Sequence, residues 1–427
     1  MTAPGSGPVI GFAGMTHLGL NSAAAAAERG FRTICFDPHA SGIEALRAGK
    51  VPVVEPQLPE LLHKNSERLE FHADVACLGK CDLVYIATDV PTDDQANSDL
   101  TEISKLIQSV AAALSPQALL VVLCQVPPGF TRRIDFDKER LFYQVETLIF
   151  GRAIERALYP ERIIVGTPTV GQPLPAALAQ YLSAFDCPVL PMRYESAELA
   201  KISINMCLVA SVTTANMLAE ICEGIGADWS EIVPALKLDR RIGEYAYLAP
   251  GLGISGGNLE RDLATVVRIG QAQGCDVATV EGWQHNSRYR RDWALRELYR
   301  LLGAGMAAPA IAVLGLAYKP DTDSIKNSPA ISLVGALPHC AVRTYDPVVS
   351  YQPPQPAEYE QCDRAIDACD NADAVVLMTP WAEFFDLDAV SLAGTMKGDL
   401  VVDPYGVLDG ERCRAAGLRH TRLGVGD

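Results

Sequence analysis

The chain has 427 residues, 49% of them hydrophobic and 21% charged, which is ordinary globular usage and more than one hydrophobic core normally serves. Its formal net charge of −16 disfavours sequence-independent binding to nucleic acid or to anionic lipid, since both need a basic surface. The 12 cysteines show no Cys-x-x-Cys pair, so neither a zinc site nor a disulfide framework is indicated. We therefore expect two or three domains with reduced thiols and no metal.

We expect no targeting signal at the beginning of the chain. Met1 is followed by a short Gly/Pro/Ser stretch rather than by a basic segment and an apolar core, and no uninterrupted apolar run reaches membrane-spanning length. The sequence therefore predicts a cytoplasmic protein with no membrane segment.

Residues 8–37 have the pattern of strand, glycine turn, alanine-rich helix and strand. Gly14 and Gly19 take the first and third glycine positions of a dinucleotide turn, whereas Thr16 stands at the second, so its side chain has to point aside or the pyrophosphate has to lie further out. Asp37 ends the second strand, where a carboxylate accepts hydrogen bonds from the adenosine ribose and repels a 2′-phosphate. NAD is predicted rather than NADP; the alternative is that the glycines only shape a tight turn.

Further apolar segments follow at 83–87 and 119–124, on either side of a helical stretch near 103–114, and another lies at 162–166. Because strands alternate with helices, a parallel, doubly wound sheet is predicted. From Ser196 the spacing of apolar residues becomes helical and predicts one long helix that ends near Gly224 and Gly226.

A second α/β pattern closes the chain, with apolar strands at 310–317, 342–346, 374–379 and 400–403. The predicted fold is α/β, with two Rossmann-like, doubly wound parallel-sheet domains joined by a long central helix. The expected domains are an NAD-binding domain (1–190), a central helical domain (191–300) and a second Rossmann-like domain (301–427).

Several stretches spread over nearly the whole chain resemble the UDP-glucose/GDP-mannose dehydrogenase family. They are Glu55-Pro56, Val126–Gly129, Glu146–Gly166, Ser196–Lys201 with Asn205, Arg241–Gly243, Pro250–Gly257 and Gly315–Asp323 through Ser328-Pro329. The resemblance implies oxidation of a sugar C6 alcohol to a carboxylate with two NAD. It also implies a homodimer, and the long helix supports one because apolar residues around its circumference need a second surface.

Lys201 and Asn205 are four residues apart and therefore share one face of the long helix. An ammonium and an amide that converge on a sugar hydroxyl would stabilise alkoxide-like charge as hydride leaves, and Asp262 could hold a water or the lysine. These three residues are the candidate centre of hydride transfer. The alternative for Lys201 is a solvated surface lysine.

The family's catalytic thiol, which captures the aldehyde, is replaced here by Asn258, and an amide is no nucleophile at neutral pH. Gln125 and Phe150 replace the threonine and glutamate that, by the resemblance, help a water to hydrolyse the thioester. Glu146 is retained and is a candidate proton donor or base, with a structural role as the alternative. Cys124 is expected to be a buried, inert thiol rather than a substitute nucleophile.

The resemblance implies that residues 191–300 form the dimerisation and substrate domain and that residues 301–427 bind the nucleotide sugar. Lys326 replaces an arginine of the family pattern and loses its bidentate geometry. Trp381 and Phe384 are expected to be core aromatics. The predicted cofactor contacts are Gly14, Thr16, His17, Leu18, Asp37, Val90 and Gln125. The predicted substrate contacts are Phe150, Arg241, Gly256, Lys319 and Lys326.

The replaced residues are those that, by the resemblance, serve the second oxidation and the hydrolysis of the thioester. The residues expected to serve the first hydride transfer remain. The leading hypothesis is therefore an NAD-dependent, two-electron oxidation of a CH–OH group on a nucleotide-activated sugar, with a UDP-sugar favoured. Two alternatives stay open: an epimerase or lyase that uses tightly bound NAD transiently, and a catalytically silent binder of NAD or nucleotide sugar.

Overall fold

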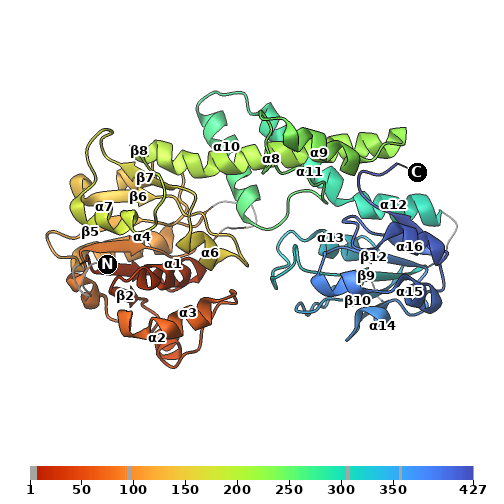
Figure 1. The fold of residues 1–427 in the computed structure, drawn as a ribbon, viewed down its shortest axis with the longest axis horizontal. Coiled ribbons are helices and arrows are strands. Elements are labelled where there is room, and N and C mark those ends of the chain that lie inside the picture. Colours follow the sequence, from red (N-terminus) through yellow and green to blue (C-terminus); the bar gives the residue numbers. More distant parts are fainter. Residues whose placement is uncertain (1–6, 92, 94–97, 304–307, 355–357, 427) are drawn as a thin grey trace. The chain divides into compact units, whose positions relative to one another are not determined.

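A computed structural model describes residues 7–91, 93, 98–303, 308–354 and 358–426. The chain divides into two compact units, Met1–Ile204 and Asn205–Asp427 (Figure 1).

The first unit is built on an eight-stranded sheet with the order β3-β2-β1-β4-β5-β6-β7-β8. Its strands are β1 (Ile10–Ala13), β2 (Thr33–Phe36), β3 (Leu69–His72), β4 (Leu83–Ile86), β5 (Leu119–Val122), β6 (Leu141–Gln144), β7 (Ile163–Thr167) and β8 (Val189–Arg193). Its helices are α1 (His17–Glu28), α2 (Ala40–Arg47), α3 (Leu58–Lys64), α4 (Thr101–Ala113), α5 (Phe130–Arg133), α6 (Ala153–Leu158), α7 (Ala176–Ser183) and the start of α8 (Tyr194–Ile225).

The predicted βαβ opening and the doubly wound sheet are confirmed, with one difference. β6 and β7 pair antiparallel, so β7 and β8 run against the first six strands of an otherwise parallel sheet. An antiparallel edge on a parallel sheet is common in folds of this class.

Two hydrophobic clusters lie on the two faces of this sheet because successive strand residues point to opposite sides. Ile10 and Phe12 join the cluster that α1 and α7 cover, whereas Val84 and Ile86 join the one that contains α4 residues such as Ile107. Their almost complete burial explains why the strands are near-continuous apolar runs.

The second unit contains a six-stranded parallel sheet with the order β11-β10-β9-β12-β13-β14. Its strands are β9 (Ala310–Leu314), β10 (Ala341–Tyr345), β11 (Glu358–Gln361), β12 (Ala374–Leu377), β13 (Leu400–Val402) and β14 (Arg419–Thr421). Its helices, after the rest of α8, are α9 (Trp229–Leu238), α10 (Asn258–Ala272), α11 (Ala278–Arg291), α12 (Trp293–Leu302), α13 (Pro329–Gly335), α14 (Ala365–Ala368), α15 (Ala389–Thr395) and α16 (Gly410–Ala415). The second Rossmann-like domain is thereby confirmed.

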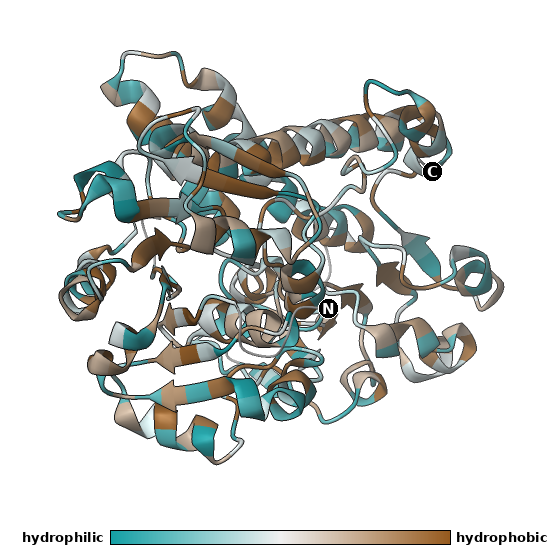
Figure 2. Ribbon diagram, turned by 60° about the vertical axis from the view of Figure 1, so that its left-hand side comes forward, coloured by the Kyte–Doolittle hydropathy of each residue, from teal (hydrophilic) through white to brown (hydrophobic). Residues whose placement is uncertain are grey.

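The long helix is also confirmed as α8, with 32 residues, and hydrophobic positions recur along it (Figure 2). By length and composition alone it could cross a membrane, which the sequence-based expectation overlooked because Ser, Thr and Asn interrupt the apolar run. Buried Asn205 and Asn216 on this helix hydrogen-bond to Asp262 and to the backbone N–H of Gly251, so one face of α8 packs within the second unit through polar contacts.

Candidate active site

The turn between β1 and α1 has the shape that a dinucleotide requires. Gly14 has a φ of +101°, and a Cβ on Gly19 would lie 1.8 Å from the carbonyl oxygen of Gly14, so only glycine fits there. Thr16 precedes α1 without capping it, and its hydroxyl accepts a hydrogen bond from the backbone N–H of Asp89 at 3.0 Å. The side chain therefore points aside, which leaves the first amides of α1 open to a pyrophosphate.

Asp37 lies directly after β2 and is fixed by its neighbours. One carboxylate oxygen accepts from the backbone N–H of Met15 at 2.8 Å, and the other accepts from the backbone N–H of His39 at 2.9 Å. The ring of His39 lies 2.9 Å from the second oxygen. The oxygen that accepts the N–H of Met15 has a further lone pair, so a role at the ribose fits this geometry and stays a prediction.

Asp37→Asn should weaken NADH binding about tenfold, since a carboxylate that holds the turn and is predicted to face the ribose is replaced by a neutral amide. A fluorescence titration with NADH measures this effect. Asp82→Asn is the matched control, because that carboxylate also accepts a backbone N–H, from Val9 at 2.8 Å, at the opposite end of the strands. Equal affinity in Asp37→Asn and the unaltered protein would contradict the assignment.

The other predicted cofactor residues contribute in different ways. His17 is the first residue of α1 and its ring is buried against Glu55, with a distance of 2.8 Å between Nε2 and Oε2. The Leu18 side chain is buried in the core, so only its backbone can face a ligand. Val90 packs against the hydrophobic cluster on the α4 face.

Gln125, after β5, is half-buried and precedes the turn at Val126–Gly129, which contains two prolines. The turn is held by Glu198 of α8, whose carboxylate accepts from the backbone N–H of Gly129 at 2.5 Å and of Thr131 at 2.8 Å. Burial raises the pKa of Glu198, although these N–H groups act in the opposite direction. The thiol of Cys124 is buried and donates to the carbonyl of Ile86 at 3.1 Å, and burial raises its pKa, so the expectation of an inert thiol is supported.

Lys201 of α8 forms an ion pair with Glu146, with a distance of 2.9 Å between Nζ and Oε1 and side chains that are only 13% and 17% exposed. The second oxygen of Glu146 accepts the backbone N–H of Leu148 at 3.0 Å. Lys201 is thus held in place by Glu146 rather than solvated at random. Phe150, in the same segment as Glu146, is exposed and its ring contacts His17.

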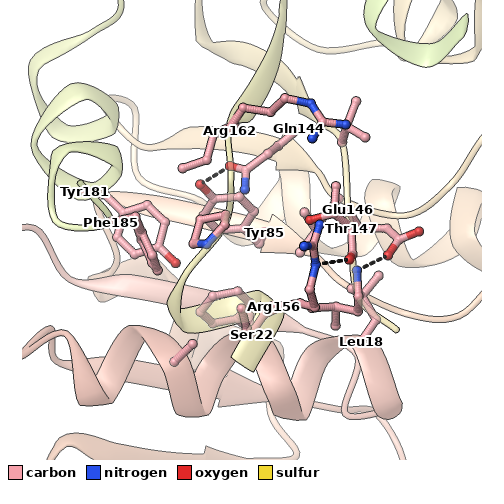
Figure 3. Close-up of a pocket in the computed structure, with 18 residues that line it drawn as sticks. Leu18, Ser22, Tyr85, Gln144, Glu146, Thr147, Arg156, Arg162, Tyr181 and Phe185 are labelled. Atoms are coloured by element: carbon pink, nitrogen blue, oxygen red, sulfur yellow. Dashed lines mark hydrogen bonds between the residues drawn. The ribbon is translucent and has the colours of Figure 1, made fainter. Parts of the chain in front are cut away.

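A cavity of about 60 Å³ lies between the sheet and the helices of the first unit (Figure 3). Glu146 and Leu18 are among the residues that line it, and the Tyr85 hydroxyl donates to Gln144 at 2.9 Å in its wall. Such a volume holds a few waters but not a dinucleotide, since ligand pockets are typically about 300–1,000 Å³. The cavity is therefore not the cofactor site.

In the second unit, Asn205 donates from Nδ2 to Asp262 Oδ2 at 2.5 Å. Asp262 is 1% exposed and its other oxygen lies 3.6 Å from Nε of the buried Arg261. Asn258 is the first residue of α10 and its side chain is exposed. Asp262 lies one turn further along the same helix.

The glycine run before α10 is fixed by two residues that the sequence pattern did not single out. The side-chain oxygen of Asn216 accepts from the N–H of Gly251 at 2.7 Å, and Ser287 of α11 accepts from the N–H of Ile254 at 2.7 Å. Asn216 is 2% exposed, and an asparagine at a buried helical position was the available signal.

Three predicted substrate residues cluster beside this run. The N–H of Gly256 donates to the carbonyl of Lys326 at 3.1 Å, and the Lys326 side chain passes close to Gly257. Lys319 lies in the loop after β9, with its Nζ 5.8 Å from the ring centre of Tyr318. Arg241, the fourth of the predicted substrate residues in this unit, is exposed and forms a bidentate ion pair with Asp239, at 3.0 and 2.7 Å.

The second sheet repeats the glycine-turn and aspartate device of the first. Asp346, after β10, accepts from the N–H groups of Leu316 and Ala317 at 2.6 and 3.0 Å, and from the Trp381 indole at 3.1 Å. Trp381 and Phe384 are 8% and 0% exposed, which confirms them as core aromatics. In the described part of the chain no group of three or more His, Cys, Asp and Glu is arranged to hold a metal.

Comparison with known proteins agrees with this arrangement. Residues 9–178 match the NAD-binding domain of the UDP-glucose/GDP-mannose dehydrogenase family, 195–287 its central domain and 312–410 its UDP-binding domain. UDP-glucose 6-dehydrogenase TuaD of Bacillus subtilis is 27% identical, with 97% of this chain and 93% of that protein covered. UDP-glucose 6-dehydrogenase of Rhizobium meliloti is 29% identical, with 97% and 99% covered.

Among solved structures, a UDP-glucose dehydrogenase from Pyrobaculum islandicum superimposes with a TM-score of 0.85 at 25% identity and covers 100% of both chains. The glycine cradle at Gly14 and Gly19 fits the NAD that this family's first domain binds. Together the two sheets, the long helix and the three matched domains lead to one assignment: the chain belongs to the UDP-glucose/GDP-mannose dehydrogenase family of NAD-dependent oxidoreductases.

Proposed function

We propose that this protein catalyses the two-electron oxidation of a CH–OH group on a nucleotide-activated sugar, with a UDP-sugar as substrate, and releases a carbonyl product. The observation that carries the proposal is the division of the family's reactive positions. Lys201 and Asn205 are each held by a carboxylate, whereas the position of the nucleophile is occupied by Asn258, which has no thiol.

Lys201 and Asn205 lie one turn apart on α8, so both can reach one substrate oxygen. Glu146 fixes the lysine and Asp262 fixes the amide, so neither donor has to be ordered at the moment of reaction. A lysine nitrogen that has given its proton to solvent can take the proton of the substrate hydroxyl and become an ammonium, whose charge the carboxylate of Glu146 balances. The ammonium and the Asn205 amide then stabilise negative charge on the oxygen.

NAD, when bound, accepts the hydride from the carbon that bears the hydroxyl. The balanced reaction is alcohol plus NAD⁺ to carbonyl plus NADH and a proton, which leaves through Lys201. A family enzyme with a thiol would hold the aldehyde for a second oxidation, whereas Asn258 allows it to leave. The proposal assigns NAD binding to residues 1–190, dimerisation and substrate binding to 191–300 and nucleotide-sugar binding to 301–427. It also assigns a cofactor contact to Gln125 and substrate contacts to Phe150, Arg241, Lys319 and Lys326.

The test is anaerobic incubation of the pure protein with NAD and a panel of nucleotide sugars, with NADH followed by absorbance and the products identified by mass spectrometry. One NADH per sugar together with a carbonyl product is expected. Two NADH together with an acid would contradict the two-electron reaction. NAD that stays bound through purification, with a product isomerised or dehydrated and no net NADH, would favour an epimerase or lyase, and binding without turnover would favour a silent binder.

We also propose that the chain forms a homodimer through α8 and α9. Large apolar side chains are exposed along this region: Met217, Ile221, Ile225 and Ile232 are each at least 38% exposed. Such a surface on a helix is stabilised when a second copy covers it. Light scattering of the purified protein should give twice the chain mass of 45.9 kDa, and a monomer at micromolar concentration would contradict the dimer.

A further inference from the structure

A buried imidazole–carboxylate pair lies next to the cofactor turn and has no part in the proposed reaction. The Nε2 atom of His17 and Oε2 of Glu55 are 2.8 Å apart, and the two side chains are 10% and 0% exposed. His17 is the first residue of α1, so its backbone belongs to the turn that receives the pyrophosphate. Its side chain leads away from that turn to a different segment.

The carboxylate of Glu55 has two further partners. Its Oε2 accepts the backbone N–H of Gly151 at 3.1 Å, and its Oε1 accepts that of Ala153 at 2.8 Å. One buried carboxylate thus joins the start of α1 to the segment between β6 and α6. Because a buried N–H that loses its acceptor is costly, these three donors hold one another in register.

Phe150 closes this connection from the outside. Its ring centre lies 4.2 Å from that of His17, and the two planes are tilted by 30°. Gly151 beside it has a φ of +85°, which lets the backbone turn back towards Glu55. The same segment begins at Glu146, the partner of Lys201.

We propose that His17 is a positioning residue that couples occupation of the dinucleotide turn to the ordering of residues 147–153. A pyrophosphate on the first turn of α1 fixes His17, which fixes Glu55, and Glu55 fixes the backbone at Gly151 and Ala153. The segment that holds Glu146 against Lys201 is then settled when NAD is bound. The proposal goes beyond the proposed reaction and requires only that the family's NAD-binding domain binds NAD(H).

The test is hydrogen exchange of residues 147–153, measured by mass spectrometry with and without saturating NADH. In the unaltered protein, NADH should slow exchange in this segment about tenfold or more. His17→Ala should abolish that slowing and raise the Kd of NADH about tenfold. Glu55→Gln should act in the same direction, because the amide NH₂ cannot accept a hydrogen bond, whereas His17→Gln keeps a donor and should restore much of the effect.

Glu70→Gln is the matched control, since Glu70 pairs with Arg32 in the same unit but makes no contact with the turn in the bonds described. If His17→Ala fails to fold, Phe150→Leu removes the ring contact with little change in volume and should lower the protection by NADH. NADH-dependent protection that is unchanged in the folded variants overturns the proposal. So does a failure of the unaltered protein to bind NADH, whereas the products of the sugar reaction test the proposed function separately.

Discussion

Lys201→Met should lower kcat by a factor of about a hundred to a thousand while the Kd of NADH stays within about twofold of the unaltered value. The reason is that Met keeps the length of the side chain but can neither take the hydroxyl proton nor stabilise charge on the oxygen, and such groups contribute factors of this size. Steady-state kinetics with the nucleotide sugar found active in the panel measures the loss. An NADH titration reports cofactor binding separately.

Lys105→Met is the matched control, because Lys105 also forms an ion pair, with Glu102 at 2.8 Å, but on the exposed surface of α4. Glu146→Gln should reproduce part of the loss, since Lys201 would keep a hydrogen-bonding partner without its charge. If the kcat of Lys201→Met were within about threefold of that of the control, Lys201 would have no role in the reaction. Thermal unfolding of each variant shows whether burial of an unpaired Glu146 has altered the fold instead.

Asn258→Cys should convert the proposed two-electron enzyme into one that traps its product covalently. The new thiolate adds to the aldehyde carbon to give a thiohemiacetal, and a second NAD⁺ takes the hydride from that carbon to give a thioester and a second NADH. By the family resemblance, Gln125 and Phe150 stand where residues that assist hydrolysis are expected, so the thioester should accumulate. The expected result is a burst of two NADH per active site followed by turnover about a hundredfold slower or less.

Mass spectrometry of the intact variant should show the added acyl sugar nucleotide, and peptide mapping should place it at residue 258. Mapping is necessary because Cys207 and Cys275 are exposed and supply a background of thiol reactivity. Asn258→Ser is the control, since a hydroxyl of similar size without an activating base should form no adduct. Addition of Gln125→Thr and Phe150→Glu to Asn258→Cys should speed release of an acid; an Asn258→Cys protein that still yields free carbonyl and one NADH would refute the trapping.

The amino-acid sequence by itself determines the dinucleotide turn, the buried strands and the residue type at position 258. The dinucleotide turn is predicted by Gly14 and Gly19, because the backbone there leaves no room for a larger side chain. The alanine-rich helix that follows and the carboxylate of Asp37 at the end of the second strand complete the pattern. Apolar runs of about four to six residues between turns predict buried parallel strands. The absence of a thiol at residue 258 is likewise a property of the sequence alone.

Tertiary structure alone decided which side chains meet. Lys201 pairs with Glu146 and Asn205 with Asp262, each across more than fifty residues of chain. The hydroxyl of Thr16 turns to Asp89, and β6 pairs antiparallel with β7. Local periodicity fixes which face of a helix or strand is buried, but a buried polar group takes whichever partner the packing brings within about 3 Å, and that partner is set by the path of the whole chain.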